Sequence, residues 1–127
     1  MKTVFDSSNI PIQFEDISSQ ITKNRSGDTM TINAYRLGNL IIGNLRLAVN
    51  SDLAPNIVFA KGFPKPDSNG TDVNVVALTI SVYNNKDAKW GFIRSTTGEA
   101  LMSGASATIT SGQTMFVSFC YIARGDE

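Results

Sequence analysis

The stretch that decides the fold runs from Gln113 to Ala123 and reads QTMFVSFCYIA. Successive residues of a β-strand point to opposite faces of the sheet, so each face can be considered separately. One face carries Met115, Val117, Phe119 and Tyr121. The other face carries Phe116, Cys120 and Ile122. Because both faces are largely apolar, this stretch predicts a central strand or a strand whose outer face meets another subunit.

The same alternation recurs upstream. The segment Val73–Tyr83 places four apolar residues on one face, namely Val76, Leu78, Ile80 and Val82. The segment Thr29–Leu37 alternates with three apolar residues that we expect to face inward, namely Met30, Ile32 and Ala34. A hairpin turn is predicted after it at Gly38-Asn39, because both residues tolerate positive φ.

The next strand, Leu40–Val49, has an apolar pattern that changes phase in the middle. The apolar positions are Leu40 and Ile42 before Gly43-Asn44, and Leu45, Leu47 and Val49 after it. A β-bulge or a sharp bend at Gly43-Asn44 would return both halves to one core, so we predict one there.

The remaining segments are short strands and loops. Short strands are predicted at Ile57–Ala60, Trp90–Arg94, Ala100–Met102 and Ala105–Thr110. Loops are predicted at Gly62–Gly70, which is rich in Pro and Gly, and at the polar segment Tyr83–Lys89. Many short strands separated by turns favour an all-β, antiparallel β-sandwich or jelly-roll single domain over residues 29–127. Residues 1–28 are expected to form an arm, a linker or a short strand.

Composition excludes several kinds of chemistry. The 127-residue chain has no His and one Cys, so His-containing catalytic triads, His-ligated zinc sites and internal disulfides are impossible. Cys120 is expected to be a buried, inert thiol. Glu15 and Asp16 are neighbours and would point to opposite faces of a strand, which disfavours an acid–base pair. The segment Asp67–Asp72 lacks the ligand pattern of an EF-hand and is interpreted as a turn. We therefore expect no enzyme activity, no metal and no cofactor.

Charge and hydropathy narrow the set of partners. Basic and acidic residues balance at 11 each, which gives no support for binding nucleic acid. The first residues contain no apolar run of signal-peptide length, and no apolar stretch approaches the roughly 18 residues of a membrane helix. The chain is expected to be made in the cytoplasm without a signal peptide and without membrane insertion.

Trp90, the single Trp, is the best candidate for contact with a ligand. It follows a polar loop, where an exposed ring could stack on the apolar face of a sugar. Tyr83, Asp87 and Arg94 lie near the same strand ends and could form hydrogen bonds to sugar hydroxyls. The alternative is that Trp90 fills the core or an interface, as a lone Trp often does.

The order of segments resembles a known family. A strand runs into Gly-Asn and a hydrophobic strand. These are followed by a Gly-x-Pro-x-Pro corner, a small-residue hairpin and a Gly-initiated strand that ends in Tyr-Ile. These features occupy Tyr35–Ile42, Ile57–Pro66, Thr97–Leu101 and Gly112–Ile122. The pattern resembles the C-terminal head domain of tail-fibre, baseplate and receptor-binding proteins from tailed phages of Gram-positive hosts.

This resemblance implies a non-enzymatic homotrimer in the phage tail. Its partners would be other tail proteins and a host-surface saccharide or teichoic acid. Two alternatives remain open, namely a purely structural tail-assembly protein without sugar binding, and a monomeric carbohydrate-binding module.

Overall fold

The computed structural model describes residues 3–5, 11–68, 74–83, 85–104 and 108–125. The described chain is built of β-strands with one short 3-10 turn, η1 (Ser18–Gln20). The strands are β1 (Thr3–Phe5), β2 (Pro11–Gln13), β3 (Glu15–Asp16), β4 (Thr22–Lys23), β5 (Thr29–Leu37), β6 (Leu40–Ala48), β7 (Val58–Lys61), β8 (Asn74–Val82), β9 (Asn85–Arg94), β10 (Ala100–Met102) and β11 (Thr114–Ile122). The all-β prediction is confirmed. No helix in these ranges is long and apolar enough to cross a membrane.

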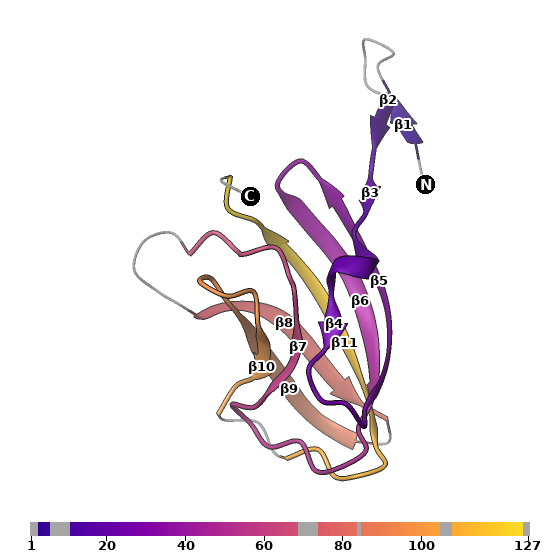
Figure 1. Ribbon diagram of the computed structural model, residues 1–127, viewed down its shortest axis with the longest axis vertical. Coiled ribbons are helices and arrows are strands. Elements are labelled where there is room, and N and C mark those ends of the chain that lie inside the picture. The colour runs from indigo at the N-terminus through magenta and orange to yellow at the C-terminus, as the bar shows by residue number, and fades with distance from the viewer. Residues whose placement is uncertain (1–2, 6–10, 69–73, 84, 105–107, 126–127) are drawn as a thin grey trace.

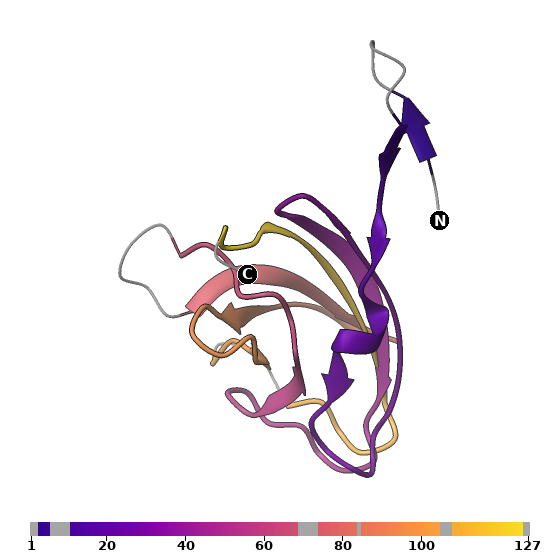
Figure 2. The same cartoon turned by 45° about the horizontal axis from the view of Figure 1, so that its top comes forward.

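Nine of the strands form one continuous antiparallel sheet in the order β3-β5-β6-β11-β8-β9-β10-β7-β4. The sheet curls into a half-barrel (Figures 1 and 2). Its two edge strands, β3 and β4, belong to one short segment of chain and are separated by η1. β1 and β2 pair in a separate two-stranded sheet, which lies apart from the half-barrel in Figure 1. The division into two facing sheets that a sandwich or jelly roll requires stays a prediction.

The segment between the two edges closes the core. The amide of Ile17 donates to the carbonyl of Ala34 on β5 (2.9 Å), and the amide of Asn24 donates to the carbonyl of Phe59 on β7 (3.0 Å). Ile17 and Ile21 are buried and pack in the main hydrophobic core. This part of residues 1–28 therefore completes the half-barrel, while the domain boundary at residue 29 stays a prediction.

β11 lies between β6 and β8, so the first of the two predicted alternatives, a central strand, is confirmed, and contact of its outer face with another subunit stays a prediction. Its inward residues are Met115, Val117, Phe119 and Tyr121, all of them buried. The Tyr121 hydroxyl donates to the carbonyl of Pro64 (2.7 Å), which gives the buried phenol a partner and fixes the Pro-rich corner to the sheet. The amide of Phe63, at the same corner, donates to the carbonyl of Gly98 (3.1 Å).

The β5–β6 hairpin turns at Gly38, whose φ of 59° confirms the predicted turn. The predicted bulge at Gly43-Asn44 is wrong, because the pairing of β6 with both neighbours runs through these residues without a shift. Ile41 faces the core in place of Ile42. Gly43 also faces inward, where a Cβ would collide with the backbone carbonyl of Asn33 on β5 and would lie 2.8 Å from the Phe119 ring. The backbone of β5 and the aromatic ring from β11 thus leave no room for a side chain at position 43.

β9 begins at Asn85, so the predicted loop Tyr83–Lys89 is wrong over most of its length. Two residues of β8, Ile80 and Val82, pair with Lys89 and Asn85 of β9, so β9 carries extra residues at this end. Backbone pairing with the long β8 strand outweighs the low strand propensity of these polar residues. Lys89 is only 3% exposed.

The shorter predicted strands agree with the structure to different degrees. β10 has the predicted bounds, and β7 differs from its prediction by one residue. Of the predicted strand Ala105–Thr110, residues 105–107 lie outside the described ranges, and Ile109 forms an isolated bridge with Leu53. In the predicted loop Gly62–Gly70, Pro66 bridges to Ala123, and residues 69–70 lie outside the described ranges.

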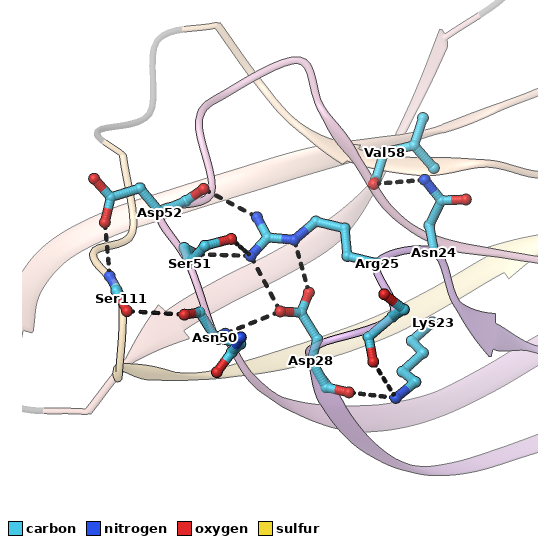
Figure 3. A network of polar contacts seen from close by, with 10 residues as sticks. Lys23, Asn24, Arg25, Asp28, Asn50, Ser51, Asp52, Val58 and Ser111 are labelled. Atoms are coloured by element: carbon cyan, nitrogen blue, oxygen red, sulfur yellow. Dashed lines mark hydrogen bonds and ion pairs between the residues drawn. The ribbon is translucent and has the colours of Figure 1, made fainter.

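A polar network fastens three loops at one end of the half-barrel (Figure 3). Asp28 is 1% exposed, and its carboxylate lies 3.0 Å from Nε of Arg25. The same carboxylate accepts a hydrogen bond from the backbone amide of Asn50 (3.0 Å). Arg25 also donates to the carbonyls of Ser51 (2.6 Å) and Asp52 (3.0 Å). The Asp52 carboxylate accepts a hydrogen bond from the amide of Ser111 (2.8 Å), so the network joins the loops that precede β5, β7 and β11.

Candidate ligand-binding surface

The convex face of the sheet carries side chains in rows that the strand register defines. At one end, two rows cross β5, β6 and β11, and all six residues are apolar or aromatic. The rows are Leu37–Leu40–Ile122 and Tyr35–Ile42–Cys120. Ile122 is 54% exposed and Cys120 is also exposed. We call these six residues the apolar patch. The apolar outer face predicted for the last strand is therefore present and continues onto β5 and β6.

The next row is polar and crosses five strands. It contains Asn33, Asn44, Ser118, Thr79 and finally Trp90. Trp90 is 41% exposed, and its ring meets the Phe92 ring edge to face at 5.2 Å between centroids. This row separates the apolar patch from the rest of the convex face.

Trp90 borders a shallow depression, here the Trp90 depression, of about 400 Å³. Its lining consists of Ala77, Leu78, Thr79, Trp90, Ser118, Phe119 and Cys120. Hydroxyl groups and an exposed aromatic ring therefore surround one open hollow. The expectation of a buried Cys120 is wrong, because position 120 falls on the convex face of β11.

A second depression, here the Arg46 depression, lies on the other side of the polar row and measures about 520 Å³. Its lining consists of Arg46, Tyr83, Gly112, Gln113, Thr114 and Phe116. The Arg46 guanidinium carbon lies 5.9 Å from the centre of the Phe116 ring, which suits a cation–π contact. Tyr83 is 69% exposed and Phe116 is 40% exposed.

The structure places three of the predicted ligand residues, Trp90, Tyr83 and Arg94, at different points of the convex face. Thr79 on β8 pairs with Trp90 on β9. Tyr83 lies four residues from this pair along β8, and Arg94 lies four residues from it along β9 in the opposite direction. Each is therefore roughly 13 Å from the pair. Arg94 forms an ion pair with Glu99 (3.1 Å). Asp87 lies in β9, but its side chain is outside the described part of the chain. Tyr83 and Trp90 therefore line different depressions.

Sequence reasoning missed Arg46 and Phe116 as neighbours of Tyr83. The alternation of side chains along β11 does place Phe116 outward, so its exposure was predictable from the sequence. The pairing of Phe116 with Arg46 on one side and Ser81 on the other depends on which strands are neighbours, and no local pattern encodes it.

Comparison with known proteins gives one structural likeness. No protein-family model matches the chain, and no curated protein matches it. The chain is similar to the head domain of the lactococcal phage bIL170, from a crystal structure concerned with the receptor-binding domains of lactococcal phages. The likeness covers 88% of this chain and 96% of the other, with 21% sequence identity and a TM-score of 0.45. The family resemblance drawn from the sequence named the same class of domain.

Proposed function

We propose that the chain is a non-enzymatic receptor-binding head domain of a phage tail or baseplate. In this proposal it assembles as a homotrimer on the virion, contacts other tail proteins and binds a host-surface saccharide. The observation that carries the proposal is the convex face, on which exposed aromatic rings border two open depressions. An aromatic ring at the rim of a hollow lined by hydroxyls suits a sugar, which has an apolar face and polar edges.

The two ends of the convex face suit different partners. The six-residue apolar patch contains no charged side chain, which favours burial against a second copy of the chain. The polar row and the Arg46 depression lie beside the patch and stay accessible if the patch alone is buried, whereas the Trp90 depression shares Cys120 with the patch and adjoins the proposed contact. Three copies would then present three sets of depressions, and weak binding at each set would add up through effective concentration.

Within this proposal Trp90 stacks on a sugar ring, and Ser118 and Thr79 are placed to form hydrogen bonds to its hydroxyls. Tyr83 serves the neighbouring depression. Asp87 and Arg94 remain candidates for contacts with the outlying parts of a larger saccharide. Arg94 would then have to exchange its pairing with Glu99 for ligand contacts.

A glycan array probed with the purified full chain tests the proposal. We expect binding by the wild type and loss of binding in Trp90→Ala. Ile57→Ala is the matched control, because Ile57 is 48% exposed and lies before β7, outside both depressions. Binding that survives Trp90→Ala would remove Trp90 from the proposed role.

The apolar patch also supports one alternative, a structural tail-assembly protein whose surfaces meet only other tail subunits. This alternative predicts a trimer that binds neither the array nor polysaccharide extracted from Gram-positive cell walls. A monomeric carbohydrate-binding module predicts the opposite pair of results, which are sugar binding and a monomeric mass at micromolar concentration.

A further inference from the structure

Arg46 is the one charged residue on the convex face of the four strands β5, β6, β11 and β8. These strands contain no Asp or Glu, and Arg36 is their only other charged residue. Arg36 pairs with the buried Ile41, so it belongs to the concave face, and its Nε donates to the carbonyl of Gly38 (2.8 Å). Within the described ranges Arg46 takes part in no ion pair. Among the described residues, therefore, no carboxylate neutralises its positive charge.

The surroundings of Arg46 hold the guanidinium in a defined place. Phe116 is its cross-strand neighbour, and the guanidinium carbon lies 5.9 Å from the centre of the ring. A guanidinium over an aromatic face keeps its N–H donors available at its edge, where they match the two oxygens of a carboxylate or phosphate. The backbone pairing of β6 with β11 fixes the two side chains in register, so fewer conformations have to be lost on binding.

The rest of the Arg46 depression suits a sugar ring. Tyr83 presents an exposed ring, and Gln113 and Thr114 bring polar groups to the rim. The volume of about 520 Å³ lies in the range of small-molecule sites. A cation, two aromatic rings and polar rim groups thus converge on one hollow, whereas the described lining of the Trp90 depression carries no charged side chain.

We propose that the Arg46 depression is an anion-selective sugar subsite. It binds a saccharide residue that carries a carboxylate or a phosphate, with the acidic group on Arg46 and the sugar ring against Tyr83 or Phe116. This inference rests on the proposed saccharide-binding function and deepens it by naming the ligand class. The Trp90 depression would take an adjacent neutral residue of the same saccharide.

The test is an NMR titration of the purified full chain, with the backbone amides of Gly112 and Thr114 as reporters. The probes are methyl glucuronide, methyl glucoside and glucose 6-phosphate. We expect the wild type to bind an acidic probe about tenfold more tightly than the glucoside. This is the lower end for hydrogen bonds to a charged group, because the depression is open to solvent. The acidic probe that binds more tightly identifies the anion as carboxylate or phosphate.

Three variants assign the preference to Arg46. Arg46→Gln should abolish the difference between acidic and neutral probes, and Arg46→Lys should retain part of it. Lys61→Gln is the matched control, because it removes the same unit of charge from an exposed position on β7 and should leave the preference unchanged. The shared backbone spectrum of the variants shows that each one is folded.

Equal affinity for all three probes in the wild type, or a preference that persists in Arg46→Gln, would overturn the inference. The result is separable from the proposed function. Acidic sugars that bind at Arg46 while cell-wall polysaccharide does not bind would contradict the receptor-binding role alone. Polysaccharide binding that depends on Trp90 and is indifferent to Arg46 would contradict the subsite alone.

Discussion

Replacing Ile122 by Asp tests whether the apolar patch is a contact between identical copies. Ile122 is 54% exposed in the single chain, so about half of its side chain remains to be buried in an assembly. Full burial of a large aliphatic side chain contributes about 1.5–3 kcal/mol, so the remaining half contributes roughly 1 kcal/mol per copy and roughly 3 kcal/mol per trimer. A buried, unpaired carboxylate adds a penalty of several kcal/mol per copy. We therefore expect Ile122→Asp to dissociate the trimer.

Size-exclusion chromatography with light scattering at micromolar concentration measures the outcome. The wild type should have three times the 13.7 kDa mass of the chain, and Ile122→Asp should have the mass of one chain. Ser81→Asp is the matched control, because it adds the same charge at an exposed convex position outside the apolar patch. Far-ultraviolet circular dichroism should show unchanged β-structure in both variants. A wild type that runs as a monomer, or an Ile122→Asp variant that stays trimeric, would refute the reasoning.

Two further predictions concern the fold. Asp28→Ala leaves the Arg25 guanidinium without its carboxylate partner, although it keeps the carbonyls of Ser51 and Asp52, and it leaves the Asn50 amide without its acceptor. It should lower the free energy of unfolding by about 2–3 kcal/mol in urea denaturation. A loss below about 1 kcal/mol would contradict the stabilising role of the network. Hydrogen bonds from the Ser18 hydroxyl and amide lower the pKa of Asp16, so its contribution to stability is present above the unfolded pKa of about 3.9 and is lost as pH falls through the lower folded pKa. Asp16→Asn should therefore destabilise the chain near neutral pH and have little effect at about pH 2, and an equal effect at both pH values would argue against this linkage.

Alternation within single strands made several features predictable from the sequence. The burial of Met115 and Val117 and the exposure of Phe116 and Ile122 follow from a period of two, which is a property of the extended backbone itself. The turn at Gly38 was predictable for a similar reason, because few residues tolerate its positive φ.

The errors arose where one strand's pattern depends on another strand. The apolar positions around Gly43 suggested a bulge, but the Phe119 ring of β11 fills the space beside this glycine and the register stays regular. The polar start of β9 resembled a loop, but pairing with β8 holds it in the sheet. In both cases the deciding partner is far away in sequence.

For the candidate ligand-binding surface, too, some features were predictable from the sequence and others depended on the tertiary structure. The sequence by itself determined an all-β chain with a central, two-sided apolar strand, with neither His nor paired cysteines for catalysis or cross-linking, and with Trp90 and Tyr83 as candidates for ligand contact. Only the tertiary structure decided that Tyr83 shares a depression with Arg46 and Phe116, and that a polar row separates this depression from the apolar patch. The physical reason is that local spacing fixes the face on which a side chain lies, whereas the order and register of strands fix its neighbours.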